Sequence, residues 1–172
     1  MQRPHTGKWF DELTPGLVIH HAIRRTITEA DNVLFTSITM NPAWLHLDFD
    51  YAAHETEFGK PLVVSTLTVA IAVGQSVTDL TQNAFANLGW DDIKMTHPVF
   101  AGDTLFSESV VLEKRESASR PHAGIVTVRS RTLNQDGVEV CSFKRTFFVY
   151  KRGAEQVADI FPEGKTPLTA ED

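Results

Sequence analysis

The sequence predicts an α+β fold in which an antiparallel sheet wraps around one buried helix. In the segment 65–81, Leu67, Ile71 and Gly74 recur at roughly helical spacing and little polar surface remains, as is typical of a helix enclosed by other elements. The second half changes to alternating patterns, and the run 138–150 alternates over its whole length, which is typical of a long strand. The simplest packing of one apolar helix and several long strands places the helix against the sheet.

The segments before this helix are expected to be short elements. Residues 1–15 are polar and contain proline, so they are expected to form an arm or an edge element. Residues 17–28 carry β-branched side chains in loose alternation and predict a first strand. Thr28 then has the character of a helix cap, and Asp31 lies three residues later, where a carboxylate favours the first turn.

The helix that begins after Thr28 is expected to end before Asn41-Pro42, because the residue before proline is driven out of the helical region. A loop is expected next, followed by a short helix over 50–56 that Gly59 and Pro61 terminate. Further along, strands are expected at 104–113, 125–133 and 138–150, with a hairpin turn at 134–137.

Composition and charge narrow the class of protein. The 172 residues carry a net charge of −6, which argues against nonspecific nucleic-acid binding. Residues 94–152 nevertheless have a balance of +4, so an anionic ligand is one interpretation and an ordinary solvated face is the other. The apolar stretches are too short and too polar to span a bilayer. The single Cys141 and the polar N-terminus predict a cytoplasmic protein, and no histidine or cysteine spacing predicts a metal site.

Three stretches resemble the MaoC-like dehydratases, relatives of the (R)-specific enoyl-CoA hydratases, in order and spacing from about residue 11 to residue 152. They are 27–31, 41–63 and 98–105, with the sequences ITEAD, NPAWLHLDFDYAAHETEFGKPLV and PVFAGDTL. The resemblance implies a hot-dog fold, a sheet curled around a long central helix, with residues 1–152 forming one domain that pairs with a second copy. Residues 153–172 are expected to form an acidic, partly mobile tail.

The sequence departs from the family motif at two places. His46 matches the motif histidine, but five residues earlier stands Asn41, where the family has an aspartate. If Asn41-Pro42 is aligned with the family's Asn-Pro, the aspartate position falls on Thr39 instead. Val64-Ser65 also replaces the His-Gly pair with which the family tends to begin its central helix.

Adding water to an unsaturated thioester needs a base, an acid and a group that stabilises the enolate oxygen. His46 is the candidate acid–base residue, because the pKa of histidine lies near working pH. Asn41 is a candidate to orient water or His46, and Asp48 a candidate to orient His46. The alternatives are that His46 packs the loop, that Asn41 forms a turn and that Asp48 is solvated.

The start of the apolar helix is the candidate oxyanion and substrate-binding site, with Val64 preceding the exposed amides of Ser65 and Thr66. The alternative is that Ser65 merely caps the helix. Basic residues on the long strands are candidates for the phosphates of coenzyme A, and cross-strand pairing with glutamates is the alternative for each. They are Arg129, Arg131, Lys144 and Arg145.

The function expected from these residues and the resemblance is reversible hydration of an α,β-unsaturated acyl-CoA, with coenzyme A as part of the substrate and no other cofactor. The missing aspartate raises the hypothesis of a dicarboxylic substrate such as mesaconyl-CoA or β-methylmalyl-CoA, whose own carboxylate would help to position water. Two alternatives stay open: a hot-dog thioesterase, and a non-catalytic acyl-CoA-binding or partner subunit. A homodimer or higher homo-oligomer is expected, because the sheet leaves edges that need protection.

Overall fold

The computed structural model describes residues 7–154, 164–166, 168 and 170. The mobility expected of the tail therefore concerns residues that lie largely outside the described part of the chain. In chain order the elements are η1 (Phe10–Glu12), β1 (Val18–His20), β2 (Arg25–Thr26), α1 (Glu29–Ile38), α2 (Trp44–Leu47), α3 (Phe49–His54), α4 (Ser65–Gln75), the π-helical turn η2 (Val77–Thr81), β3 (Ala84–Met95), β4 (Thr104–Glu116), β5 (Ala123–Leu133) and β6 (Glu139–Tyr150).

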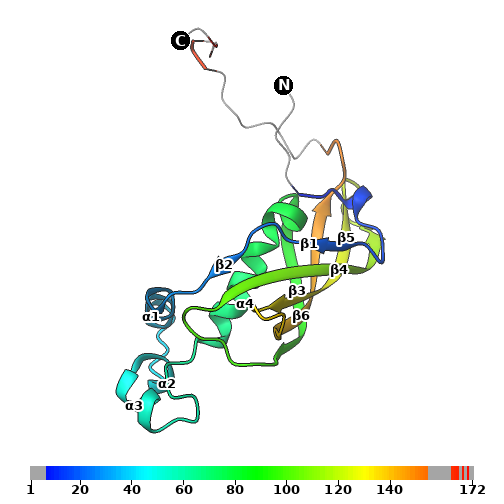
Figure 1. Ribbon diagram of the computed structural model, residues 1–172. Coiled ribbons are helices and arrows are strands. Elements are labelled where there is room, and N and C mark those ends of the chain that lie inside the picture. The colour runs from blue at the N-terminus through cyan, green and yellow to red at the C-terminus, as the bar shows by residue number, and fades with distance from the viewer. Residues whose placement is uncertain (1–6, 155–163, 167, 169, 171–172) are drawn as a thin grey trace.

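The strands form one antiparallel sheet in the order β1-β4-β5-β6-β3, with β2 paired to β4. Helix α4 lies across the curled sheet, while α1, α2 and α3 project together from one end (Figure 1). Leu67 and Ala72 of α4 share a buried cluster with Leu105, Val140 and Phe143 of the strands. This is the predicted α+β arrangement, with the sheet curled around the central helix.

Strand β3 was not predicted, because its sequence does not alternate. It is the edge strand next to β6, its residues from Asp91 onward are exposed, and its pairing with β6 shifts register at three places. Asp92 has a φ of 50°, a left-handed conformation that interrupts the strand. An edge strand with one side open to solvent does not need alternating apolar and polar residues. The hydrophobic pattern that indicated the other strands is therefore missing from β3.

Three further predictions need correction. The strand expected at 17–28 is two short strands, β1 and β2, separated at His21–Arg24. Part of the loop expected after Pro42 is the four-residue helix α2. The central helix ends at Gln75, and its predicted continuation to 81 is a π-helical turn.

Residues 7–15 close one end of the core rather than forming a free arm, and residues 1–6 of the predicted arm lie outside the described part of the chain. Phe10 and Leu13 are 4% and 0% exposed and pack in a cluster with Leu80, Val126 and Phe147. The ring of Phe10 lies directly against Gly124 of β5, where an added Cβ would stand 2.1 Å from a ring carbon. Glycine is required at this position because only its bare backbone leaves room for the ring.

Polar side chains lie between the end of α4 and the inner face of the sheet. The Gln75 side chain donates to the carbonyl of Leu105 over 2.7 Å and accepts from Ser107 Oγ over 2.5 Å. Ser107 also bonds to Thr132 of β5 at 2.8 Å. Each of these groups is buried and satisfied, so the network adds directional contacts to an otherwise apolar interface.

His21 is a buried histidine that links the β1–β2 segment to η2 and β4. Its Nε2 lies 2.9 Å from Ser109 Oγ, its Nδ1 lies 3.8 Å from a carboxylate oxygen of Asp79, and its side chain is 0% exposed. Burial lowers the pKa of His21 below the ordinary value of 6.5, against the opposing charges of Asp79 and Glu108 and with a small contribution from His20.

We expect this histidine to make folding stability depend on pH. Because the pKa is lower in the folded protein, the unfolded chain binds the proton first, so stability falls as pH drops below 6.5 and levels off below the folded pKa. Each unit of lowering corresponds to about 1.4 kcal/mol. Urea unfolding between pH 8 and 5 would show this slope, and His21→Gln should flatten it. An unchanged slope in the variant would assign the pH dependence to other groups.

No helix in the described part of the chain combines the length and the hydrophobicity needed to cross a membrane.

Candidate active site

His46 lies on α2, where its ring is oriented by a backbone carbonyl. Its Nδ1 lies 2.8 Å from the carbonyl oxygen of Leu62. A carbonyl oxygen only accepts, so Nδ1 must carry the hydrogen, and in the neutral ring Nε2 is then the basic nitrogen. The geometry therefore presents His46 as a general base through Nε2.

Asn32 of α1 holds the backbone around this histidine in place. It is 4% exposed, its Nδ2 donates to the carbonyls of His46 and Leu62 at 3.2 Å each, and its Oδ1 accepts the amide of Val64 at 2.9 Å. One neutral side chain thus ties α1, α2 and the start of α4 together. Sequence reasoning missed Asn32, for which the available signal was a polar residue on the buried side of a predicted helix.

His46 lines a small pocket of about 60 Å³, here called the His46 pocket. Glu29 of α1 and Lys60 line this pocket together with His46. Lys60 Nζ also lies 4.2 Å from the centre of the Phe100 ring. The remaining lining residues are Asn32, Val33, Phe49, Pro61 and Ala101. Glu29 was not identified as a site residue from the sequence, yet it lines the pocket that contains the histidine.

Asn41 and Asp48 are both engaged in local backbone contacts. Asn41 Oδ1 accepts the amide of Ala43 at 3.1 Å, which forms a turn before α2. Asp48 is the N-cap of α3 and accepts the amide of Tyr51 at 2.9 Å. The contact of Asn41 is the turn given as its alternative, whereas Asp48 caps a helix, a role that was not predicted for it from the sequence. The ring of His46 is oriented by Leu62 instead.

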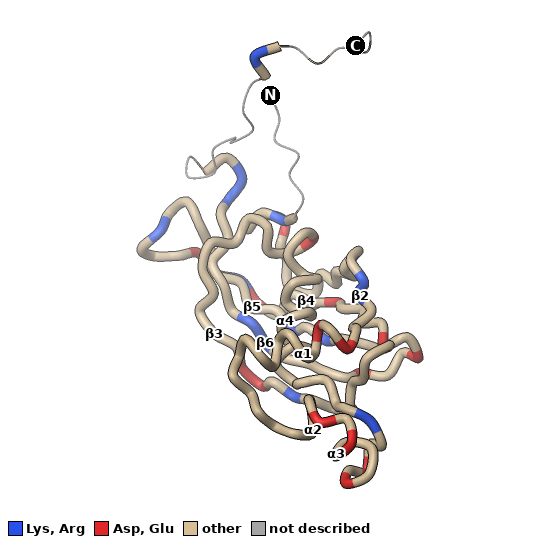
Figure 2. The backbone as a smooth tube through the Cα atoms, turned by 90° about the vertical axis from the view of Figure 1, so that its left-hand side faces the viewer, with Lys and Arg blue, Asp and Glu red and all other residues tan. Residues whose placement is uncertain are grey.

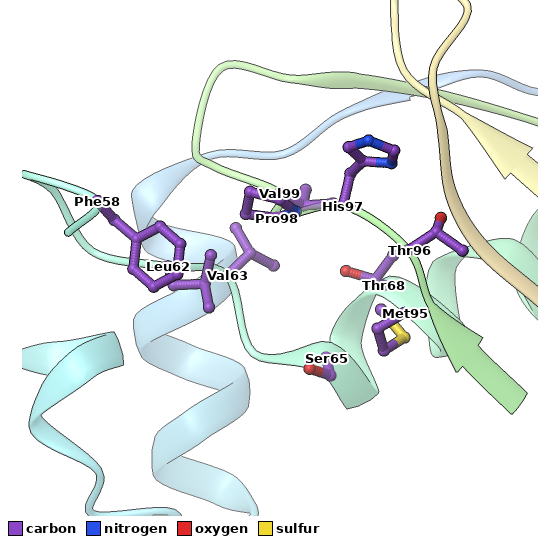
Figure 3. Close-up of a pocket in the computed structure, with 10 residues that line it drawn as sticks. All are labelled: Phe58, Leu62, Val63, Ser65, Thr68, Met95, Thr96, His97, Pro98 and Val99. Carbon is purple, nitrogen blue, oxygen red and sulfur yellow. The ribbon is translucent and has the colours of Figure 1, made fainter. Parts of the chain in front are cut away.

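The start of α4 borders a second pocket of about 240 Å³, here called the α4 pocket. Val64, rather than Ser65, is the N-cap, and its amide is already donated to Asn32. Ser65 and Thr66 are the first two residues of the helix, and their amides have no acceptor within it, whereas the Leu67 amide donates to the Val64 carbonyl at 3.0 Å. Figure 3 shows the ten lining residues, Phe58, Leu62, Val63, Ser65, Thr68, Met95, Thr96, His97, Pro98 and Val99.

His46 and Ser65 line different pockets in one chain, and the segment 58–63 contributes residues to both. Leu62 joins them most directly, because its carbonyl bonds to the His46 ring and its residue lines the α4 pocket. The structure therefore ties both the His46 ring and the start of α4 to the same short segment.

The four basic candidates on β5 and β6 differ in their surroundings. Arg131 pairs with Glu108 at 2.5 Å, which is the cross-strand glutamate pairing given as the alternative. Lys144 pairs instead with an aspartate, Asp92 of the neighbouring strand β3, at 2.7 Å. Arg145 is 5% exposed and bonds to Asn87 and Ser76, which makes it part of the core.

Arg129 is exposed and lines a shallow outer pocket of about 370 Å³ together with Arg131. Figure 2 shows Lys and Arg positions on the neighbouring strands β5 and β6 and acidic positions around α1, α2 and α3. Among the described residues, no group of three histidine, cysteine or acidic side chains is placed to hold a metal ion.

Helix α4 is not enclosed as the sequence predicted, because one face packs on the curled sheet while Thr66, Ala70 and Gly74 are exposed. The sheet order, this helix and the projecting α1–α3 segment define a protein of the hot-dog class. A mycobacterial protein described as having a double hot-dog fold superposes with a TM-score of 0.74 at 26% identity, over 96% of this chain and 53% of its own. An R-hydratase from Pseudomonas aeruginosa superposes with a TM-score of 0.73 at 25% identity, over 93% of this chain and 97% of its own.

The family model for mesaconyl-CoA hydratase matches residues 2–164, and the chain belongs to this family of MaoC-like hydratases and dehydratases. A mesaconyl-CoA hydratase from Cereibacter sphaeroides is 32% identical over 99% of this chain. A MaoC domain protein dehydratase from Chloroflexus aurantiacus superposes with a TM-score of 0.79 at 30% identity, over 97% of this chain and 47% of its own. The chain spans about half the length of the Cereibacter relative, 50% of which is matched.

Proposed function

We propose that the chain catalyses the reversible addition of water to an α,β-unsaturated acyl-CoA. One observation carries the proposal: the Leu62 carbonyl fixes the hydrogen of His46 on Nδ1, which leaves Nε2 as a base in a pocket that also contains Glu29. Membership of the hydratase family supports the same reaction.

In the proposed mechanism, His46 is the base that removes a proton from water. Nε2 accepts that proton while the oxygen of water bonds to the β-carbon, and the electrons of the double bond move to the thioester oxygen as an enolate. The amides of Ser65 and Thr66 stabilise this oxygen, because first-turn amides and the helix dipole both favour negative charge. Return of a proton to the α-carbon completes the hydration, and Glu29 is the candidate carboxyl group for this step.

Glu29 also offers a replacement for the aspartate that the family motif places before its histidine. Asn41 and Thr39 occupy the two alignments of that position, and both are used in local contacts, Asn41 with Ala43 and Thr39 with the Phe35 carbonyl. Asn41 and Asp48 are then structural supports of the α2 region. A carboxylate from α1 supplies the acid–base partner that these residues lack.

The proposed substrate is a short branched dicarboxylic thioester of the mesaconyl-CoA and β-methylmalyl-CoA type. The description of the matching family and the activity named for the Cereibacter relative support this choice. The coenzyme A phosphates would meet Arg129, which is exposed and lines the outer pocket beside Arg131. A cytoplasmic location remains a prediction.

The test is the loss of enoyl-thioester absorbance on adding purified protein to mesaconyl-CoA or to crotonyl-CoA, with thiol release followed in parallel. We expect hydration of mesaconyl-CoA without thiol release. Preference for crotonyl-CoA would contradict the dicarboxylic substrate, and thiol release would favour the thioesterase. No reaction with either compound would favour the non-catalytic partner subunit.

We further propose that two copies of the chain associate. Strand β3 is an unprotected edge that exposes Leu88, Trp90 and Ile93 by 52%, 41% and 50%, and such edges call for a cover. The Cereibacter mesaconyl-CoA hydratase is about twice as long as this chain, and one solved relative is described as having a double hot-dog fold, so a second copy is the proposed cover. Light scattering after size-exclusion chromatography should give twice the monomer mass at micromolar concentration, and Trp90→Glu should shift the mass toward the monomer. A monomeric wild type would contradict the proposal.

A further inference from the structure

The α4 pocket contains a buried hydroxyl that the hydration mechanism does not use. Thr68 is 0% exposed, and its Oγ1 has no hydrogen-bond partner among the described residues. Figure 3 shows this oxygen directed into the pocket, between Val63 and the start of α4. Buried hydroxyls in proteins are normally bonded, often to the carbonyl four residues earlier in a helix. An unbonded hydroxyl that faces a cavity therefore indicates a ligand group with which it would bond.

The other polar groups of the pocket favour an anion. His97 Nδ1 lies 2.8 Å from the Glu139 carbonyl and so carries the hydrogen. Ser65 precedes Thr68 by one helical turn, at the positive end of the α4 dipole. None of the ten lining residues carries a carboxylate, and most are apolar. A negatively charged group in this pocket would thus meet hydrogen-bond donors and no negatively charged side chain of the lining residues.

We propose that the α4 pocket binds the free carboxylate of a dicarboxylic acyl group, with Thr68 as a specificity-determining donor. This proposal rests on the proposed hydratase function. Side chains three apart on a helix have Cβ atoms about 5–6 Å apart, a distance that a four-carbon skeleton can span. The thioester oxygen then meets the first-turn amides while the far carboxylate meets Thr68. The role of the substrate carboxylate is recognition, which leaves the acid–base chemistry to His46 and Glu29.

The kinetic test compares a dicarboxylic and a monocarboxylic substrate in Thr68→Val, which removes the hydroxyl and keeps the shape. We expect kcat/KM for mesaconyl-CoA to fall by about 10- to 100-fold, as for a lost hydrogen bond to a charged group, with little change for crotonyl-CoA. Thr68→Ser should recover most of the loss. Thr81→Val, at a buried threonine of η2 away from the pocket, should leave both rates unchanged. Equal losses with both substrates in Thr68→Val would overturn the proposal.

A binding measurement separates this proposal from the hydratase assignment. Succinyl-CoA and butyryl-CoA are saturated thioesters of equal chain length that cannot be hydrated, and they differ in the terminal carboxylate. Calorimetry should show tighter binding of succinyl-CoA to the wild type and a difference reduced at least tenfold in Thr68→Val. Equal affinity of the wild type for the two compounds would overturn the carboxylate site even in an active hydratase. A preserved difference in an inactive protein would retain the site and reject the hydratase.

Discussion

His46→Ala is expected to lower kcat/KM for enoyl-CoA hydration by about 10²- to 10⁴-fold, the range associated with loss of a positioned general base. The loss should fall on kcat, because the Nε2 nitrogen acts on water in the transition state rather than on the coenzyme A portion of the substrate. Initial rates of absorbance loss at several substrate concentrations would separate kcat from KM.

His54→Ala is the matched control for this substitution. His54 lies on the neighbouring helix α3, its side chain is 70% exposed, and within the described part of the chain it pairs with Asp50 one turn earlier. Removing it should leave the rate within about twofold of the wild type. Retention of more than a tenth of the activity in His46→Ala would show that another group accepts the proton, and Glu29 would then be the first residue to replace.

Asn32→Ala is expected to lower the free energy of unfolding by about 2–4 kcal/mol and to impair hydration as well. The substitution leaves the His46 and Leu62 carbonyls and the Val64 amide without their partner, and an unsatisfied buried group costs about 1–3 kcal/mol. The same three groups orient the catalytic histidine and the start of α4. Urea unfolding gives the free energy, and rates measured well below the unfolding midpoint give the effect on activity.

Ser37→Ala provides the comparison on the same helix. Ser37 is exposed and its hydroxyl donates only to the Val33 carbonyl within α1, so its removal should change stability by less than about 0.5 kcal/mol. A change below 1 kcal/mol in Asn32→Ala would mean that water satisfies the freed backbone groups. In that case Asn32 would not be the residue that holds the site together.

Local pattern was sufficient to predict the central architecture. Helix α4 and strands β4 to β6 bury one continuous face each, so their periodicity is visible in the sequence. The hairpin at 134–137 follows from side-chain chemistry: Asn134 accepts two backbone amides of the turn, and Gly137 takes a φ of 77°. The cap of α1 was predicted for the same reason, since Thr28 and Asp31 bond to each other's backbone amides.

The remaining features depend on contacts between residues far apart in the chain. Strand β3 is defined by its pairing with β6, and Phe10 finds its place only once Gly124 is beside it. In the site, the motif identified His46, but the roles of Glu29, Asn32 and Thr68 depend on which cavity each residue reaches. Sequence spacing carries no information on such cavities. The basic strand residues show the same limit, because Arg145 lies in the core and Arg129 is exposed.

The polar contacts of Gln75 determine how far α4 can slide along the sheet. An apolar helix on an apolar sheet tolerates small axial shifts, since one methyl group replaces another at little cost. The hydrogen bonds from Gln75 to Leu105 and Ser107 do not tolerate such a shift. A displacement of one residue along the helix axis, about 1.5 Å, would leave these buried donors and acceptors without partners. The helix is rigid over its 11 residues, so anchoring its last residue also fixes the depth of its first. The contacts of Gln75, at the opposite end of α4, thereby determine the distance between the Ser65 amide and the pocket wall.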